Sequence, residues 1–265
     1  MPPLTACIIT RDEEANLAAC IASVRPVVQE VLVVDSGSTD RTVEIARALA
    51  DRVVVRDWPG HVAQKQFAVD QAANRFVLCI DADERLTPEL QASVRALMAG
   101  DADPPCAGYE VARRTLYLGR FLRRGGWYPG RKLRLFDRTR ARWGGIDPHD
   151  RVVCDGAVGR LSGDLVHFTY RDLDHHVATL NGYTATAALE KRRRGAGAGA
   201  ALLGMLLRPP ARFLKMYLLR GGFLDGVAGL TAAVVASFYV FLKYAKLWEV
   251  ARVGRPWPRP GEPER

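Results

Sequence analysis

The sequence predicts an α/β domain with a mostly parallel sheet and helices on both faces, followed by C-terminal helices that associate with a membrane. Two observations carry this prediction. Continuous apolar runs alternate with helical segments over about the first 100 residues, which is typical of β-α-β units. Beyond residue 200 the chain becomes strongly apolar, with basic residues at intervals, a composition typical of interfacial helices.

The first part of the chain is expected to alternate between strands and helices. The expected strands are 4–10, 30–35, 52–56 and 76–80, and the expected helices are 14–24, 39–50, 62–73 and 87–98. Ser38 or Thr39 is expected to cap the second helix, and Pro88 lies in the first turn of the fourth. Ligands of such sheets bind at the carboxyl ends of the strands.

The later part of the chain has a different composition. Residues 104–168 are rich in Gly, Arg and Trp, which indicates strands and loops that complete the sheet. A helix over 172–194 and a Gly/Ala hinge over 195–201 follow. The expected division is therefore a sheet domain at 1–170, a helix and hinge at 171–200, apolar helices at 201–253 and a flexible tail at 254–265.

The uncharged run 226–242 bears on how the C-terminal region meets a membrane. As a helix it would be about 25 Å long, less than the roughly 30 Å of a bilayer core. Basic residues flank it on both sides, so the positive-inside rule gives no orientation. We expect helices that lie in the interface of the cytoplasmic leaflet, with basic residues on anionic head groups. A helical cap on the sheet domain and a single membrane span are the alternatives.

The net charge and the cysteines indicate which partners and which cellular compartment to expect. The net charge of +9 points to an anionic partner. Nucleic acid is not expected, because the basic residues interleave with apolar runs and no binding motif is visible. No G-x-G-x-x-G follows the first strand, so a nicotinamide dehydrogenase is not expected either. The five cysteines are scattered and no signal peptide is recognised, which favours a reducing, cytoplasmic setting.

Carboxylates follow two of the expected strands. Asp81 and Asp83 come after 76–80, and residues i and i+2 of an extended chain project to the same side. Two such carboxylates repel each other unless a hard cation such as Mg²⁺ or Mn²⁺ binds them. Asp35 ends the expected strand 30–35 at the same sheet edge, where it can accept hydrogen bonds from a base or ribose. The alternatives are a solvated acidic turn before Thr87 and an Asp35 that only begins a tight turn.

Eight motifs together point to a family. They are I-I-T-R-D-E-E-A-N-L (8–17), V-V-D-S-G-S-T-D (33–40), Q-K-Q-F-A (64–68), L-C-I-D-A-D-E (78–84), G-G-W-Y-P (125–129), L-R-L-F (133–136), P-H-D-R-V (148–152) and F-L-K-Y-A-K-L-W-E (241–249). With them nearly the whole chain resembles family 2 glycosyltransferases of the GT-A fold. The resemblance is strongest to the bacterial β-1,4-glucosyltransferase branch that acts on the lipopolysaccharide inner core.

The resemblance implies how a nucleotide sugar would be bound. Thr10, Glu13 and Asp35 would line the base and ribose, and Lys65 would approach the diphosphate, where a flexible ammonium suits a point charge. Asp81 would be the first carboxylate of the D-x-D pair.

The resemblance also implies a metal site and a catalytic base. Asp83 would be the direct ligand of Mg²⁺ or Mn²⁺ and His167 a further ligand, although a buried core histidine is the alternative. The family is inverting, so a base must take the proton of the acceptor hydroxyl opposite the leaving diphosphate. Asp150 matches that position. The family pattern has Glu there, so the shorter Asp needs a closer backbone.

The acceptor side is expected around the Gly-Gly-Trp-Tyr-Pro loop. Trp127 and Tyr128 would form an apolar platform for a sugar ring, with an aromatic plug as the alternative. Arg134 belongs to a basic cluster that suits a phosphorylated acceptor or lipid head groups.

The sequence thus predicts an inverting, metal-dependent transferase at the cytoplasmic face of the bacterial inner membrane, bound peripherally to its anionic surface. The expected donor is a UDP-sugar, with UDP-glucose as first choice, and the expected acceptor is a lipopolysaccharide core or related glycolipid. One alternative transfers a sugar to polyprenyl phosphate or another glycolipid. Another is a catalytically idle nucleotide-binding scaffold on the membrane.

Overall fold

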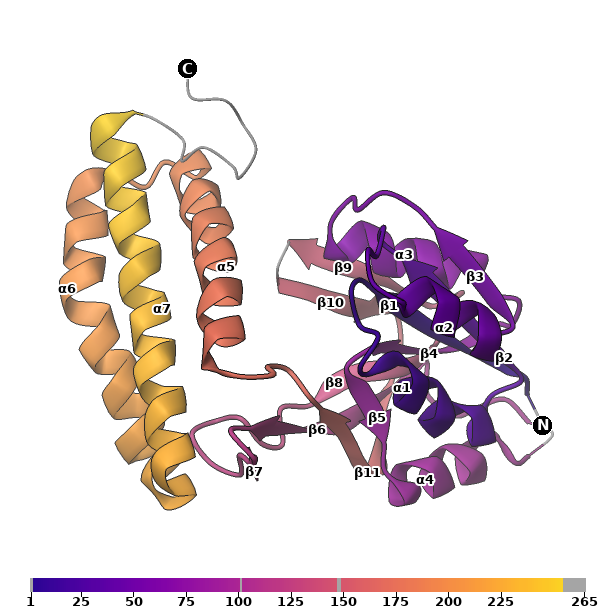
Figure 1. Ribbon diagram of the computed structural model, residues 1–265. Helices are drawn as coiled ribbons and strands as arrows, with labels where there is room; N and C mark the ends of the chain where they lie inside the picture. Colours follow the sequence, from indigo (N-terminus) through magenta and orange to yellow (C-terminus); the bar gives the residue numbers. More distant parts are fainter. Residues whose placement is uncertain (1, 101, 147–148, 255–265) are drawn as a thin grey trace. The chain divides into compact units, whose positions relative to one another are not determined.

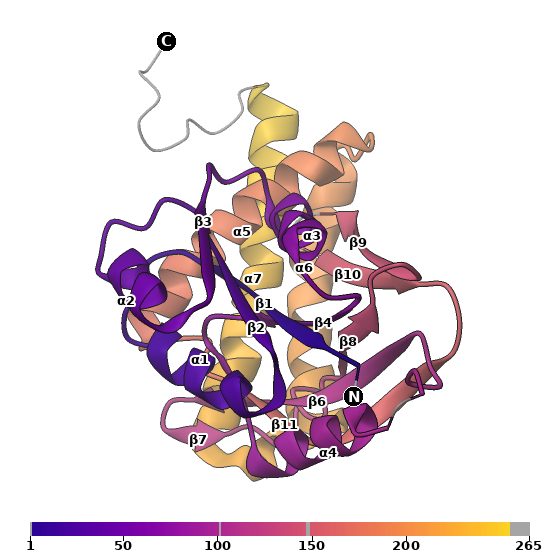
Figure 2. The same cartoon turned by 90° about the vertical axis from the view of Figure 1, so that its right-hand side faces the viewer.

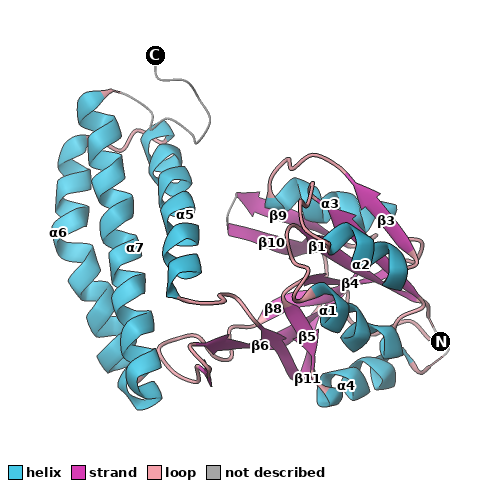
Figure 3. Ribbon diagram, viewed as in Figure 1, coloured by secondary structure: helices cyan, strands magenta, loops and turns pink. Residues whose placement is uncertain are grey.

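The computed structural model describes residues 2–100, 102–146 and 149–254 of the chain (Figure 1). The chain forms two compact units. The first comprises the described residues of Met1–Thr115 and Pro129–Thr169, and the second those of Leu116–Tyr128 and Tyr170–Arg265. Figure 3 distinguishes the mixed α/β content of the first unit from the helices of the second.

A nine-stranded sheet forms the frame, in the order β3-β2-β1-β4-β8-β6-β11-β5, with β7 paired to β6. Its strands are β1 (Leu4–Thr10), β2 (Glu30–Asp35), β3 (Arg52–Val55), β4 (Phe76–Asp81), β5 (Glu84–Leu86), β6 (Gly108–Tyr117), β7 (Arg120–Phe121), β8 (Lys132–Asp137) and β11 (Val158–His167). A separate antiparallel pair consists of β9 (Ala141–Ile146) and β10 (His149–Cys154). The first unit also contains α1 (Leu17–Val24), a 3₁₀ turn (Arg25–Val27), α2 (Thr42–Leu49), α3 (His61–Gln71) and α4 (Pro88–Met98).

The register of the parallel strands brings their carboxyl ends together. β1 lies between β2 and β4 and runs parallel to both. Thr10 pairs with Asp35, and Ile9 pairs with Asp81. The polar residues that follow three strands therefore share one sheet edge, as the sequence predicts.

Helices cover both faces of this sheet (Figure 2). Alternate residues of β1 point to opposite faces, so that Leu4 and Ile8 enter one apolar cluster and Cys7 enters the other. Residues of α1, α2 and α4 belong to the first cluster. Residues of α3 and Trp143 of β9 belong to the second. This arrangement confirms the predicted α/β fold class.

The starts of two helices differ from the prediction. α1 begins at Leu17, because the carbonyl of Glu13 accepts the N–H groups of residues 16 and 17 in a preceding turn. α2 begins at Thr42, and neither Ser38 nor Thr39 caps it. Both instead contact Asp12, whose N–H donates to Ser38 Oγ at 2.8 Å and whose carboxylate accepts the N–H of Thr39 at 2.7 Å. These side chains join the ends of β1 and β2.

The second unit is built on three long helices. They are α5 (Leu173–Arg193), α6 (Ala198–Leu214) and α7 (Gly226–Val253), with a π-helical turn (Lys215–Leu219) and a 3₁₀ turn (Gly222–Asp225) between the last two. α6 approaches α7 closely at Gly204, where a Cβ atom would lie 2.5 Å from the ring of Tyr244. Lys246 of α7 donates to Asn181 Oδ1 and Thr184 Oγ1 of α5 at 2.7 and 2.8 Å. The hinge expected at 195–201 is shorter, since α6 begins at Ala198.

The length argument against a membrane span does not hold in the structure. The run 226–242 is only part of α7, whose 28 residues extend about 42 Å. The segment Gly222–Val253 is long and apolar enough to cross a membrane by length and composition. Of the tail expected at 254–265, residues 255–265 lie outside the described residues.

Candidate active site

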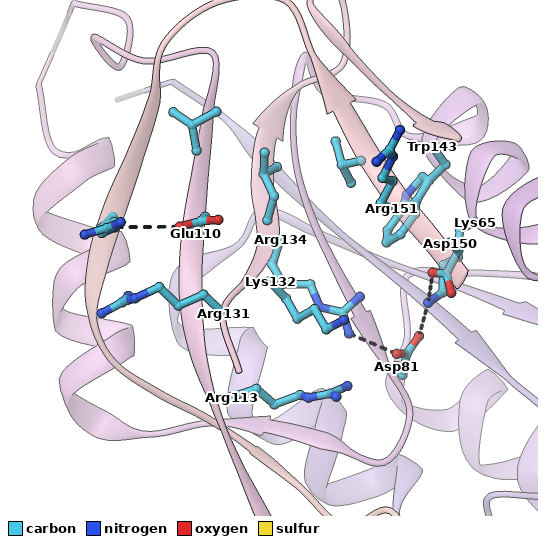
Figure 4. A pocket seen from close by; sticks show the side chains of 14 residues that line it. Lys65, Asp81, Glu110, Arg113, Arg131, Lys132, Arg134, Trp143, Asp150 and Arg151 are labelled. Carbon is cyan, nitrogen blue, oxygen red and sulfur yellow. Dashed lines mark hydrogen bonds and ion pairs between the residues drawn. The ribbon is translucent and has the colours of Figure 1, made fainter. Parts of the chain in front are cut away.

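A chain of alternating charges lies where β4 ends (Figure 4). Asp81, the last residue of β4, forms an ion pair with Lys65 of α3, and Lys65 Nζ lies 3.0 Å from Asp81 Oδ1. The same ammonium donates to Asp150 Oδ2 of β10 at 2.8 Å. On the other side, Arg134 Nη2 of β8 donates to Asp81 Oδ2 at 3.0 Å. Four predicted site residues are therefore in direct contact, although Lys65 and Asp150 are 85 positions apart.

Burial and opposite charges set the protonation states of this cluster. Burial lowers the pKa of Lys65, but attraction to Asp81 and Asp150 outweighs burial, and the pKa is raised. Burial raises the pKa of Asp81, but Lys65 and Arg134 reverse this effect and hold the pKa well below its usual range. At neutral pH Asp81 is therefore a carboxylate and Lys65 an ammonium.

The buried residue Glu84 binds two members of this cluster, Arg134 and Asp81. Its side chain is fully buried, and its Oε1 accepts from Arg134 Nη2 at 2.6 Å. Its Oε2 accepts the backbone N–H of Asp81 at 3.0 Å. Arg134, itself only 3% exposed, is thus held by two carboxylates within the D-x-D region. The sequence prediction placed Arg134 on the acceptor side, without these partners.

Asp83 has a different partner from Asp81. β4 ends at Asp81 and β5 begins at Glu84, so residues 82–83 form a turn and the extended spacing that would make the two carboxylates converge is absent. Asp83 Oδ2 lies 3.1 Å from His167 Nε2, at the end of β11. The other ring nitrogen of His167, Nδ1, is buried and has no hydrogen-bond partner among the described residues.

The donor types of Asp83 and His167 fit a divalent cation. One carboxylate oxygen and one imidazole nitrogen suit Mn²⁺ in particular, and Mg²⁺ commonly binds through one or two carboxylates. Within the described parts of the chain, no group of three or more His, Cys, Asp or Glu side chains is placed to hold a metal. A cation here would therefore take further ligands from water and from a bound phosphate.

The residues predicted to contact a nucleotide lie at the same sheet edge. Thr10 is buried at the end of β1, and its Oγ1 has no hydrogen-bond partner in the described structure. Asp35 is fully buried, and its Oδ1 accepts the N–H groups of Gly37 and Ser38, each at 2.9 Å. Ser38 Oγ donates to its Oδ2. Asp35 therefore shapes the turn after β2, which was the alternative role. Glu13 accepts from Asn16 Nδ2 at 2.8 Å.

The residues predicted to form a sugar platform belong to the second unit. Trp127 stacks on Tyr117 with ring centroids 5.9 Å apart, within an apolar cluster that includes residues of α7. This packing matches the alternative of an aromatic plug for Trp127. The side chain of Tyr128 is 39% exposed.

A pocket of about 880 Å³ opens beside the charged cluster. It is lined by Lys65, Asp81, Glu110, Arg113, Arg131, Lys132, Leu133, Arg134, Trp143, Asp150, Arg151, Val152, Val158 and Arg160. The sequence analysis assigned no role to Glu84, Arg113 or Trp143. Trp143 packs its ring 4.7 Å from Lys65 Nζ. No quoted motif contains Arg113 or Trp143, and the motif that ends at Glu84 gives no sign of its buried partner, since the strand pairing that gathers these residues depends on long-range register.

Comparison with known proteins identifies the family. The model of glycosyl transferase family 2 matches residues 5–159. The lipopolysaccharide core biosynthesis glycosyltransferase LpsC of Rhizobium meliloti is 32% identical over 93% of this chain and 92% of its own. An uncharacterized glycosyltransferase of Rickettsia typhi is 31% identical over 96% of this chain and 90% of its own.

Among solved structures, a glucosyl-3-phosphoglycerate synthase from Mycobacterium tuberculosis with Mn²⁺ and UDP is 24% identical, with a TM-score of 0.34. The overlap covers 44% of this chain and 45% of that one, which is too little to transfer any property. The family model and the two relatives over nearly their full length are sufficient: the chain is a glycosyltransferase and belongs to glycosyl transferase family 2.

Proposed function

We propose that this protein is an inverting, metal-dependent transferase that moves glucose from UDP-glucose onto a lipopolysaccharide core or related glycolipid. The relative LpsC, named for lipopolysaccharide core biosynthesis, supports this acceptor class. The observation that carries the proposal is the contact of Lys65 with both Asp81 and Asp150, because it places the D-x-D region and the candidate base at one pocket.

Asp150 is the proposed base. Its carboxylate lines the pocket and is oriented by Lys65, so an acceptor hydroxyl that enters the pocket can pass its proton to Asp150 as the bond to the anomeric carbon forms. The shorter side chain reaches this position because β10 pairs with β9, whose Trp143 packs against Lys65.

The donor would lie along the sheet edge formed by β1, β2 and β4. Thr10, Glu13 and the turn shaped by Asp35 would surround the base and ribose, and Lys65 would meet the diphosphate. A divalent cation held by Asp83 and His167 would neutralise the charge that develops on the leaving diphosphate.

The first test is a calorimetric titration of UDP into detergent-purified protein, with and without Mn²⁺, with ADP, GDP and CMP as controls. We expect selective UDP binding that Mn²⁺ strengthens and EDTA weakens. Asp83→Ala should lose the effect of Mn²⁺, because the carboxylate is one of the two proposed protein ligands. Equal UDP affinity in Asp83→Ala and the unsubstituted protein, both with Mn²⁺, would remove Asp83 from this role. No binding of any nucleotide by the folded protein would favour the idle scaffold.

We also propose that the second unit attaches the protein to the cytoplasmic face of the bacterial inner membrane. Several large apolar side chains of this unit are strongly exposed, including Leu206 at 61% and Leu219 at 82%. Basic residues Arg208, Arg212 and Lys215 lie between them in sequence. Exposed apolar side chains interspersed with positive charge suit an anionic lipid surface.

Vesicle flotation tests the attachment. The full chain should float with vesicles that contain phosphatidylglycerol and bind much less to phosphatidylcholine vesicles, with a difference that shrinks at high salt. Leu206→Asp should reduce flotation, because it places a charge among the exposed leucines, whereas Leu49→Asp, on exposed Leu49 of the first unit, should not. Equal flotation of both variants would contradict the proposal.

A further inference from the structure

The lining of the pocket carries more positive charge than its acidic residues can balance. Seven lysine and arginine side chains face three aspartate and glutamate side chains. The glycosyl transfer proposed above requires a cation at the leaving diphosphate, and Lys65 and Arg134 already supply positive charge beside Asp81. The remaining basic residues therefore have no function in the chemistry described so far.

The basic residues of the pocket fall into two groups by their partners. Lys65 and Arg134 pair with Asp81, Asp150 and Glu84, and Arg160 Nε lies 3.6 Å from Glu110 Oε2. In contrast, the side chains of Arg131, Lys132 and Arg151 form no hydrogen bond or ion pair with any described residue.

Lys132 lies among other positive charges. Partial loss of water around its ammonium lowers the pKa, and repulsion from Arg113 and Arg134 lowers the pKa further, against a weaker attraction to Asp150 and Glu84. Among the described residues, the side chain of Arg113 pairs with Glu84 alone, at 3.7 Å, and Glu84 is already bound by Arg134 at 2.6 Å. An anion beside Lys132 and Arg113 would relieve this repulsion and supply the hydrogen-bond acceptor that the Lys132 ammonium lacks among the described residues.

The position of this group relates it to the acceptor. Figure 4 shows Asp81, Asp150 and Lys65 together at one side of the pocket, Lys132 and Arg113 extending toward that side, and Arg131 extending in the opposite direction. An acceptor hydroxyl must reach Asp150 if that residue is the base. The rest of the acceptor then lies along the pocket, beside Lys132 and Arg113.

We propose that the acceptor carries an oxyanion, a phosphate or a carboxylate, close to the sugar that is attacked, and that Arg113 and Lys132 bind this group. The inference rests on the proposed function, since it places the acceptor beside Asp150. It adds that the enzyme distinguishes a charged acceptor from a neutral sugar. The guanidinium group of Arg113 can bind such an anion through paired N–H donors, and the ammonium of Lys132 through a charge-assisted hydrogen bond.

The test measures binding of glucose 6-phosphate, glucuronate and glucose to the full chain with UDP at saturation and at constant ionic strength, by ligand-observed NMR. Glucose 6-phosphate or glucuronate should bind at least about tenfold more tightly than glucose, as expected for charge-assisted hydrogen bonds. The tighter of the two identifies the anion as phosphate or carboxylate.

Two variants and a matched control assign the effect to the pocket. Lys132→Gln and Arg113→Gln should each reduce the preference for the charged sugar about tenfold. Lys132 has no described side-chain partner to lose, and Arg113 loses one ion pair of 3.7 Å with Glu84, which Arg134 still binds. Arg47→Gln removes the same charge from an exposed position of α2 and should leave the preference unchanged.

The outcomes separate this inference from the proposed function. UDP affinity should be the same in all four proteins. Equal binding of glucose and the charged sugars, or a preference that survives in both Lys132→Gln and Arg113→Gln, would overturn the inference while UDP binding still supports the proposed function. Weaker UDP binding in these two variants would also overturn it, because the cluster would then serve the donor diphosphate. Failure of the unsubstituted protein to bind UDP would overturn both proposals.

Discussion

Replacement of Asp150 by Asn should lower kcat by roughly 10²-fold or more while UDP affinity stays within about threefold of the original. The amide has nearly the shape of the carboxylate, and its oxygen can still accept from Lys65 Nζ, which lies 2.8 Å from Asp150 Oδ2. What the amide cannot do is take a proton from the acceptor hydroxyl. The variant therefore separates proton transfer from the positioning of Lys65.

Steady-state transfer from UDP-glucose to a lipopolysaccharide-core acceptor, measured by product mass and rate, checks this expectation. Asp150→Glu is the matched control, because it keeps a carboxylate and the family pattern has Glu at this position. The kcat of this variant should lie within about tenfold of the original. Asp70→Asn removes an exposed carboxylate of α3 and should have no effect. Near-normal turnover in Asp150→Asn would exclude Asp150 as the base.

The sheet edge could be predicted from the sequence because local signals agree there. β1 and β2 have the expected bounds, since each is a continuous apolar run bordered by polar residues. Their parallel pairing places Thr10 beside Asp35, as the β-α-β pattern requires. The helix starts could not be predicted in the same way. Asp12 adopts a left-handed conformation with φ of 52°, and it binds residues that would otherwise be available as caps for α2.

The sequence could identify the charged residues of the site, but it could not predict which of them contact one another. Lys65, Asp81 and Asp150 each belong to a recognisable motif, yet the contact among them depends on how α3, β4 and β10 pack. Glu84 shows the limit most clearly. In the sequence it follows the D-x-D pair, where a solvated acidic turn was one of the expectations. In the structure it is fully buried, because β5 pairs with β11 and returns the chain into the sheet. No local pattern encodes that pairing.

The pairing of Glu84 with Arg134 leads to the largest stability effect that we expect. Arg134→Met should lower the free energy of unfolding by about 3–5 kcal/mol, because it leaves the buried carboxylate of Glu84 without its principal cation. Arg113 lies 3.7 Å from Glu84 and compensates only in part. The methionine fills much of the volume of the arginine, so the loss reports charge rather than packing.

Urea unfolding followed by circular dichroism, in the same detergent for every variant, measures the change. The double variant Arg134→Met/Glu84→Gln should recover part of the loss, since it removes both buried charges together, and the difference from additivity gives the coupling energy. A single Arg134→Met variant within about 1 kcal/mol of the original protein would show that Glu84 does not depend on Arg134.

The pH dependence of the same variant provides an independent check on Asp81. Arg134 and Lys65 hold the pKa of Asp81 below its value in the unfolded chain, so this carboxylate adds stability that is fully present above the unfolded pKa, about 3.9, and is lost as the pH falls through the folded pKa. Without Arg134 the folded pKa of Asp81 should rise toward the unfolded value, although Lys65 still lies 3.0 Å away. The stability difference between the two proteins should therefore be largest at neutral pH and should shrink below about pH 4. A difference that stays constant from pH 7 to pH 3 would mean that Arg134 stabilises the fold by packing alone.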